Sequence, residues 1–185
     1  MTALVPPDVD RWRPWAAMVD DFGGTAEMHG SGHWNLTGDP VATEAGCAEF
    51  VAMTELTSTA DLDGTRVACT YYWIAAGHGA PDDELVGFLS LRHTLNDFLL
   101  EEGGHIGYSV KPSARQRGHA TTALARALEA AAGIGITQAL VTCDVDNDPS
   151  RRTIERNGGV LEDVRKGKRR YWVPTAGERS SGRSR

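Results

Sequence analysis

The sequence predicts one mixed α/β domain, in which a central β-sheet carries helices packed on its faces. Two observations support this fold class. Segments rich in β-branched and aromatic residues alternate along the chain with segments whose apolar residues recur at helical spacing. The chain has 185 residues, of which 41% are hydrophobic and 24% charged, and this length suits a single core. We expect the domain to span residues 1–174 and a disordered basic tail to occupy residues 175–185.

The N-terminal part is predicted to form two helices separated by a glycine-rich loop. Residues 11–22 place Trp12, Trp15 and Val19 at helical spacing, and residues 41–57 return to that spacing. Residues 23–40 contain five glycines, which are too many for a regular element. The loop also carries side chains that form hydrogen bonds, namely His29, Ser31, His33, Trp34 and Asn35. A functional loop is therefore expected here.

Three strands are predicted in the middle of the chain. Residues 66–76 and 85–91 are dense in β-branched, aromatic and aliphatic residues, and the Gly, Pro and Asp residues between them indicate a hairpin loop. After an irregular connection, apolar residues alternate with small or polar ones over residues 105–110. This alternation predicts a strand that Pro112 ends.

The remaining elements follow in short succession. From Gly118 onward the apolar residues fall at helical spacing, and residues 138–145 form an apolar strand. Asp148 is predicted to cap a short helix with Pro149 in its first position. Two strands around Lys166-Gly167 then give a terminal hairpin.

The turn at residues 115–120, between a strand and a helix, has the features of an anion site. A helix N-terminus offers unpaired backbone N–H groups and the positive end of its dipole. Gly118 and Ala120 leave room for a ligand near the backbone, and Arg115 and Arg117 can bind phosphate. The GxxxxGK[ST] and GxGxxG patterns of other phosphate sites are absent. A diphosphate cradle is predicted, with an ordinary turn carrying surface arginines as the alternative.

These residues resemble the GNAT family of N-acetyltransferases, whose signature [RQ]-x-x-G-x-[GA] follows a strand and opens a helix. Arg115, Gly118 and Ala120 match that signature. The pattern Asn147-x-x-Ser150-x-x-x-Ile154-x-x-x-Gly158 is similar to the family's next strand-to-helix motif. The resemblance covers residues 85–172, and both motifs occur in the family's order.

The resemblance implies acetyl-CoA, or another short acyl-CoA, as the donor, and a central twisted mixed sheet flanked by helices on both faces. The strands at 105–110 and 138–145 would splay apart, with the pantetheine arm lying along the first. The residues matched to donor binding are Val110, Arg115, Gln116, Arg117, Gly118, His119, Ala120, Thr121, Asn147 and Ser150. Among them, the cradle residues would bind the diphosphate, and the Val110 backbone would meet the pantetheine or the thioester. Asn147 and Ser150 would meet the pantetheine end.

A narrower resemblance concerns the pattern LRHxLNxxLxxxGGHIGYxVxP, which is similar to bacterial acetyltransferases of undefined substrate. This pattern suggests His93 and Asn96 as residues near the acceptor. In the glycine-rich loop, His29, His33 and Trp34 are candidates to line the acceptor pocket. Alternatively, Trp34 only pins the loop to the core.

Acyl transfer to an amine needs a base, a donor for the oxyanion and an acid for the thiolate. His105 stands where related enzymes often carry a glutamate base, and Glu102 is the second choice for this role. Family members commonly carry a tyrosine acid on the downstream helix, where this chain has Ile154. Tyr108 or Ser150 would replace that tyrosine, unless the thiolate leaves without a protein acid.

We therefore expect an N-acetyltransferase that acts on a primary amine by direct attack in a ternary complex. The acceptor would be a small molecule, with peptide or protein amines as alternatives. An acyl-CoA-binding sensor without turnover is the competing hypothesis, because the tyrosine is missing at Ile154. A homodimer is also compatible with the resemblance.

Composition narrows the remaining choices. No apolar run long enough for a membrane span and no secretory signal are visible, so we expect a cytoplasmic protein. The three cysteines are odd in number and widely spaced, and the histidines lack metal-ligand spacing, so no metal is expected. Eight of the 19 Lys and Arg residues lie within residues 165–185, but this segment is typical of a solvated end rather than of a nucleic-acid site.

Overall fold

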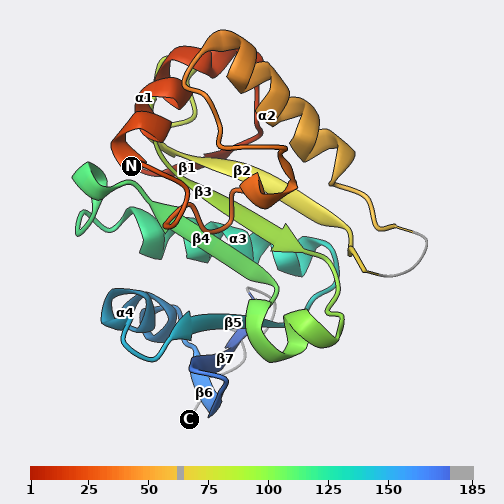
Figure 1. Cartoon of the computed structure of the whole chain (residues 1–185). Helices are drawn as coiled ribbons and strands as arrows, with labels where there is room; N and C mark the ends of the chain where they lie inside the picture. The colour runs from red at the N-terminus through yellow and green to blue at the C-terminus, as the bar shows by residue number, and fades with distance from the viewer. Residues whose placement is uncertain (62–64, 176–185) are drawn as a thin grey trace.

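The strands of the protein form two separate antiparallel sheets (Figure 1). The computed structural model describes residues 1–61 and 65–175. The first sheet has the order β1-β2-β3-β4 and the second the order β5-β7-β6. The strands are β1 (Ala3–Val5), β2 (Cys69–Ala76), β3 (Glu84–Arg92), β4 (Ile106–Val110), β5 (Gln138–Asp144), β6 (Val160–Arg165) and β7 (Lys168–Pro174). Helices pack on the faces of the sheets, and this architecture confirms the predicted mixed α/β fold class.

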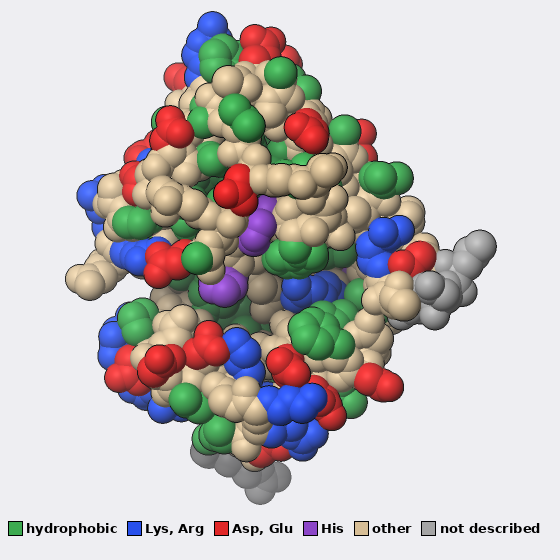
Figure 2. Space-filling view, in the orientation of Figure 1, with side chains coloured by type: hydrophobic (Ala, Val, Ile, Leu, Met, Phe, Trp, Pro, Cys, Tyr) green, Lys and Arg blue, Asp and Glu red, His purple; other side chains and the backbone are tan. Residues whose placement is uncertain are grey.

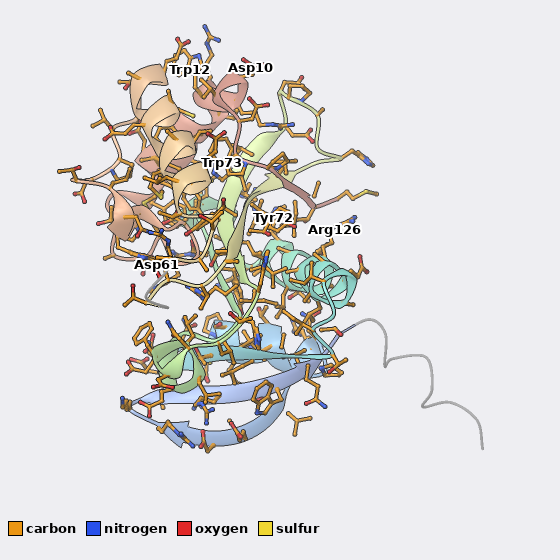
Figure 3. All side chains as sticks on the ribbon, turned by 90° about the vertical axis from the view of Figure 1, so that its right-hand side faces the viewer. Asp10, Trp12, Asp61, Tyr72, Trp73 and Arg126 are labelled. Atoms are coloured by element: carbon orange, nitrogen blue, oxygen red, sulfur yellow. The ribbon has the colours of Figure 1, made fainter. Side chains whose placement is uncertain are left out.

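Helices cover both faces of the first sheet. Helices α1 (Trp12–Phe22) and α2 (Glu44–Leu56) lie on one face, and α3 (His119–Gly133) lies on the other (Figure 1). Trp73 and Tyr72 are neighbours on β2 and point to opposite sides, Trp73 toward α1 and α2 and Tyr72 toward α3 (Figure 3). Successive residues of a strand point to opposite faces of its sheet, so β2 contributes side chains to a hydrophobic core on each face.

The two cores are apolar and closely packed. Below α1 and α2, Trp15 and Phe50 pack with ring centroids 5.4 Å apart, and Phe50 and Phe88 with centroids 5.6 Å apart. On the other side, the apolar stripe of α3 is fully buried against the first sheet. Each large apolar side chain buried in this way contributes about 1.5–3 kcal/mol to folding. Both cores hold the first sheet rigid as the support for any site at its edge.

The edge strands β4 and β5 lie next to each other but belong to different sheets. They meet at His105, whose backbone N–H donates to the carbonyl of Leu140 at 2.7 Å. Beyond this point the strands separate, as expected from the resemblance. Helix α4 (Asp148–Arg156) packs on the second sheet and follows directly after β5. The separated strands and the start of α4 therefore surround a common space.

Several element boundaries differ from the prediction. The helix predicted from residue 41 begins at Glu44, because the Thr43 side chain accepts the N–H of Gly46 and caps it there. The strand predicted from residue 66 begins at Cys69. No pattern in the sequence indicated β1, which is three residues long and owes its existence to pairing with β2.

The cap of α4 was assigned to the wrong residue. We predicted Asp148, but the N-cap is Asn147, whose side-chain oxygen accepts the N–H of Ser150 at 3.0 Å. Asp148 is instead the first helical residue, where it pairs with Arg151 at 3.0 Å. Both residue types can cap a helix, so the local sequence did not separate them.

The described chain ends with Thr175, which is buried and whose hydroxyl donates to the carbonyl of Ile136 at 2.7 Å. The rest of the predicted tail lies outside the described residues. No helix in the described ranges combines the length and the apolar character that crossing a bilayer requires.

Candidate functional site

A cavity of about 740 Å³ lies where β4 and β5 separate. Its walls come from the loop at residues 23–40, from β2, β3, β4 and β5, from the segment before β4 and from the start of α4. Figure 2 shows it as a hollow between the upper and lower parts of the molecule, with histidine side chains at its upper rim. A concave site of this size suits a small ligand.

The cavity brings together many of the predicted site residues. Those that line it are His29, Trp34, Asn96, Glu102, Tyr108, Asn147 and Ser150. The other predicted site residues do not line it, namely His33, His93, His105, Val110 and all residues of the turn at 115–121. The cavity is therefore distinct from the predicted diphosphate cradle, which lies at the other end of β4.

The predicted cradle has the backbone of an open helix start. Gln116 and Gly118 have left-handed φ angles of 61° and 84°, and Gly118 is the N-cap of α3. The first backbone N–H groups of α3 have no intrahelical acceptor, because an α-helix leaves its first turn unpaired. A Cβ built on Gly118 would meet no protein atom within 4 Å. The space before these amides is therefore free for an anion, and a side chain at this position would intrude into it.

The charged residues of the cradle are partly engaged. Arg115 donates from Nε to the carbonyl of Val110 at 3.0 Å, and its Nη2 lies 2.5 Å from a carboxylate oxygen of Glu27. The hydrogen bond from Arg115 lowers the pKa of Glu27. Arg117 is exposed, and His119 contacts the Thr2 hydroxyl at 3.0 Å. These residues fit a diphosphate, although Glu27 competes for Arg115.

The turn before α3 is anchored from two sides. Lys111 is 5% exposed and lies 2.8 Å from the carboxylate of Glu84. Asp21 on α1 accepts hydrogen bonds from the N–H and the hydroxyl of Ser113. The hydroxyl bond is the main reason that the pKa of Asp21 is lowered. The cradle is therefore held against both the first sheet and α1.

A hydroxyl pair occupies the part of the cavity near α4. The Tyr108 hydroxyl lies 2.8 Å from the Ser150 hydroxyl. Burial is the main reason that the pKa of Tyr108 is raised well above its usual range. Tyr108 therefore keeps its proton at neutral pH. Ile154, at the position where the family commonly carries tyrosine, is fully buried in the core and supplies no proton.

His105 occupies a structural position between the two sheets. Its Nδ1 accepts the backbone N–H of Leu140 at 2.9 Å, and the residue is 7% exposed. Burial, together with the charge of Arg92, lowers its pKa to about 4. The lone pair on Nδ1 is thus engaged and the neutral ring is favoured. This environment suits a link between β4 and β5 better than the predicted role as a base.

Glu102, the second candidate for the base, does line the cavity. Its carboxylate lies 3.3 Å from Lys166 Nζ in the hairpin turn of the second sheet. Its backbone carbonyl accepts the hydroxyl of Thr142 on β5 at 2.6 Å. These contacts fix the segment before β4 against the second sheet and leave Glu102 at the cavity wall.

The residues predicted for the acceptor pocket divide into two groups. His29, Trp34 and Asn96 line the cavity, and Trp34 is 57% exposed at its edge. His33 instead contacts the Ser31 hydroxyl at 2.9 Å, and His93 contacts the Thr70 hydroxyl at 2.8 Å. Burial lowers the pKa of His33. These two histidines support the walls rather than face the cavity.

Glycine allows the loop to approach β4 closely. Gly30 has a φ of 78°, and a Cβ at this position would lie 2.3 Å from the carbonyl oxygen of Gly107. The loop carbonyl of His29 accepts the Ser109 hydroxyl at 2.7 Å. The glycine content that marked this segment in the sequence therefore serves its contact with the strand.

A row of cavity residues on β2 and β3 was not predicted from the sequence. Cys69, Tyr71, Ser90 and Arg92 all line the cavity. Their segments have the composition of apolar core strands, which concealed the polar positions. The period-2 spacing of a strand could have identified two of them. Phe88, Ser90 and Arg92 are two residues apart and therefore lie on the same face of β3.

Within residues 1–61 and 65–175, no three His, Cys, Asp or Glu side chains gather closely enough to hold a metal ion. Two cysteines line the cavity, and burial raises the pKa of Cys69 to about 11 and also raises that of Cys143. Both therefore remain protonated thiols at neutral pH.

Solved structures share this fold at low sequence identity. RimJ of Mycobacterium smegmatis, in complex with a CoA disulfide, is 20% identical, with a TM-score of 0.65 over 97% of this chain and 84% of that chain. RimL, a ribosomal L7/L12 α-N-protein acetyltransferase in complex with coenzyme A, is 18% identical, with a TM-score of 0.61 over 94% of each chain. The microcin C7 self-immunity acetyltransferase MccE, in complex with acetyl-CoA and AMP, is 13% identical, with a TM-score of 0.59 over 94% of this chain and 92% of that chain. At these identities the likeness establishes the fold.

A comparison with the sequences of curated proteins finds no match. The family model described as the acetyltransferase (GNAT) domain, in contrast, matches residues 7–160. This range includes the cradle, both separating strands and the start of α4. Because the match spans most of the chain and both halves of the site, the protein belongs to the GNAT family of acetyltransferases.

Proposed function

We propose that the protein transfers an acetyl group from acetyl-CoA to a primary amine of a small molecule. The observation that carries this proposal is the continuous arrangement of cradle, strand and cavity. The open amides of α3 lie at one end of β4 and the cavity lies along the other end. An extended donor bound by the cradle can therefore follow β4 and present its thioester to the cavity.

The donor supplies an activated acetyl group as a thioester. We assign the diphosphate to Arg115, Arg117 and the first amides of α3, since helix starts with arginines bind such anions. Asn147 and Ser150, at the cavity, would contact the pantetheine end. The proposed donor site therefore uses both strand-to-helix turns of the chain.

The chemistry needs one proton to leave the amine and one to reach the departing sulfur. The amine nitrogen attacks the thioester carbon, a C–N bond forms and the C–S bond breaks. We assign the base to Glu102, acting directly or through a water, because it lines the cavity as a carboxylate paired with Lys166. We assign the acid to Tyr108, assisted by Ser150, and the oxyanion donor to the Val110 backbone N–H.

The size of the cavity favours a small acceptor over a folded protein surface. About 740 Å³ must hold the reactive end of the donor and the acceptor together. Typical small-molecule pockets have about 300–1,000 Å³. RimL acts on a ribosomal protein, so a peptide N-terminus is the second acceptor class that the test must include.

The test is an amine panel with direct detection of the free thiol released from acetyl-CoA. We expect thiol release that depends on a small primary amine, and a loss of about 100-fold in kcat for Glu102→Gln with little change in donor affinity. Acetyl-CoA binding without thiol release from any amine would favour the sensor hypothesis. The test includes the sensor hypothesis because Ile154, at the position where the family commonly carries a tyrosine acid, is buried and supplies no proton.

We also propose that the protein acts in the cytoplasm. The cysteines Cys47, Cys69 and Cys143 are all free and buried. Reduced thiols and the use of acetyl-CoA both suit the cytoplasm.

A further inference from the structure

Arg92 is a cation at the wall of the cavity that forms no ion pair with an acidic side chain of residues 1–61 or 65–175. Its Nη1 donates to the carbonyls of Gly103 and Gly104, both at 3.3 Å, and the residue lines the cavity. Among the described residues, no Asp or Glu forms an ion pair with Arg92, and burial lowers its pKa. A guanidinium has five N–H donors and stays charged in proteins. Most of its capacity for hydrogen bonds is therefore available.

Ser90 is a second polar residue at the wall of the cavity. The residue is 1% exposed, and its hydroxyl has no hydrogen-bond partner among the described residues. Unsatisfied buried hydroxyls are rare, because each costs roughly 1–3 kcal/mol. A Cβ placed on Gly107 of β4 would lie 3.4 Å from Ser90 Oγ and 3.5 Å from Arg92 Nη1. The Cα of Gly30 in the glycine-rich loop would lie 3.5 Å from the same Cβ. Ser90 and Arg92 therefore lie side by side next to Gly107, in the part of β4 that borders the cavity.

Tyr71 completes this side of the cavity. It is paired with Ser90 in the register of β2 and β3, and Ser90 is paired with Gly107 in the register of β3 and β4. The three residues thus form one row across the sheet. The Tyr71 hydroxyl lies 3.2 Å from the Thr57 hydroxyl, which fixes the ring from the end of α2.

The acids of the cavity are engaged elsewhere. Asp61 accepts the N–H of Arg66 at 2.7 Å, and Asp144 lies 2.5 Å from Lys168. Glu102 pairs with Lys166. The charge that Arg92 presents to the cavity is therefore positive, and its complement is an anion with hydrogen-bond acceptors.

We propose that Arg92 and Ser90, with Tyr71 beside them, bind the carboxylate of the acceptor, which is therefore a small amine of the amino-acid type. A guanidinium binds a carboxylate through two parallel hydrogen bonds, and a hydroxyl can donate a third. In an α-amino acid one carbon separates the carboxylate from the amine. Anchoring the carboxylate on Arg92 thus holds the amine beside β4, along which the thioester is proposed to lie. This inference rests on the proposed acetyl transfer.

The residues at the edge of the cavity indicate the chemistry of the acceptor beyond its amine and carboxylate. Trp34 and Phe98 both line it and are 57% and 62% exposed. Exposed aromatic side chains at the opening of a pocket favour an apolar body. Leucine and phenylalanine are therefore the first acceptors to compare.

The test compares each carboxylate with its uncharged amide. For the CoA-loaded protein, calorimetry measures the binding of N-acetylleucine and of N-acetylleucinamide. We expect the carboxylate to bind about 10- to 100-fold more tightly, which is the usual range for hydrogen bonds to a charged group. Arg92→Gln should remove this preference and Arg92→Lys should retain part of it. Equal binding of both ligands by the unmodified protein, or an unchanged preference in Arg92→Gln, would overturn the proposal.

Two further variants guard against loss of folding and against unspecific charge effects. Ser90→Ala removes a hydroxyl that makes no hydrogen bond, so it should fold normally and still weaken carboxylate binding several-fold. Arg13→Gln removes the same charge on α1, where Arg13 stacks on Trp12 at 4.6 Å from the ring centroid, and should keep the preference. An unchanged preference in Ser90→Ala would also count against the site.

Turnover separates this inference from the proposed function. With leucine and leucinamide as acceptors, Arg92→Gln should lower kcat/KM for leucine alone. An equal fall for both acceptors would assign Arg92 to catalysis and overturn the carboxylate site. Preferential binding of N-acetylleucine without any transfer would instead leave the site intact and remove the enzyme proposal. A preference for an aminoalkylphosphonate over the matching carboxylate would overturn the choice of carboxylate.

Discussion

Tyr108 and His105 lie close together in the sequence, but their side chains meet different surroundings. The Tyr108 hydroxyl lines the cavity next to Ser150. The His105 ring is withdrawn from the cavity and accepts a hydrogen bond from Leu140. A role in proton transfer is therefore proposed for the tyrosine, and a structural role for the histidine.

Tyr108→Phe removes the proposed acid and leaves the ring in place. We expect kcat to fall about 10- to 100-fold, with little change in acetyl-CoA affinity, because the thiolate would leave without a proton donor. Steady-state kinetics combined with a donor-binding titration measures the two effects. Tyr72→Phe, on the face of β2 toward α3, is the matched control and should keep its rate. An unchanged kcat in Tyr108→Phe would mean that the thiolate needs no acid from this residue.

His105→Leu removes the acceptor of the Leu140 N–H, whereas His105→Asn can retain an acceptor near the position of Nδ1. We expect the first variant to lose roughly 1–3 kcal/mol of folding free energy and the second to lose less. Denaturant unfolding measures both. Neither variant should change the pH dependence of kcat near neutrality. A fall of kcat by about 100-fold in His105→Asn would restore His105 as the base.

The same histidine makes stability depend on pH. Its pKa is lowered from 6.5 to about 4 in the folded protein. Below pH 6.5 the unfolded chain binds this proton and the folded chain does not, so stability present above pH 6.5 is lost as the pH falls toward 4. Unfolding at about pH 7.5 and at about pH 5 should show a smaller acid loss in His105→Asn than in the unmodified protein.

At the scale of the element, the proposed anion site depends on the start of α3 rather than on any one side chain. The left-handed Gly118 is the N-cap of this helix, and a Cβ added to it would meet no protein atom within 4 Å. Arg115 adds charge, but Glu27 already pairs with it. Donor affinity should therefore depend more on backbone access than on this arginine.

Gly118→Ala tests this dependence on the backbone. The Cβ would enter the open space before α3, so we expect roughly a 10-fold or greater loss of acetyl-CoA affinity in a titration. Alanine at a φ of 84° also costs about 1 kcal/mol of stability.

Gly135→Ala is a close control for this variant. Gly135 has a φ of 87° and lies beyond the other end of α3, and a Cβ added there would likewise meet no protein atom within 4 Å. The two variants therefore share the backbone strain and differ in their distance from the cradle. Equal donor affinity in both would contradict the assignment of the cradle.

At the scale of the whole molecule, the site lies between two sheets that share one hydrophobic core with α3. The cavity has β2, β3 and β4 on one side and β5 with α4 on the other. A ligand that binds both sides joins them, and a ligand that binds only the folded state raises its stability. Donor binding should therefore stabilise the entire fold.

Thermal unfolding measures this effect. Acetyl-CoA at about 100 times its Kd should add about 2.7 kcal/mol, which corresponds to a rise in Tm of roughly 5–10 °C for a chain of this size. Gly118→Ala at the same concentration should show a smaller rise. The absence of any rise in the unmodified protein would contradict donor binding to the folded state.

Many of the elements could be predicted from the sequence, because they depend on neighbouring residues. Helical spacing located α1 and α3, and period-2 alternation located β4. The anion site at the turn from Arg115 to Ala120 is a prediction of the same local kind. Local sequence patterns did not predict features that depend on pairing between strands far apart in the sequence. Strand β1 exists only through its partner β2, and the register of three strands sets Tyr71, Ser90 and Gly107 in one row.

By itself the sequence determined the fold class, the family resemblance and the expected donor, because these are encoded in local patterns of spacing, glycine and charge. Only the tertiary structure decided that the ring of His105 is engaged between the sheets and that Arg92 and Ser90 line the cavity. The physical reason is that desolvation and hydrogen bonding depend on residues distant in the chain. The roles proposed for His105, Ser90 and Arg92 therefore depend on which groups surround each side chain in the folded protein.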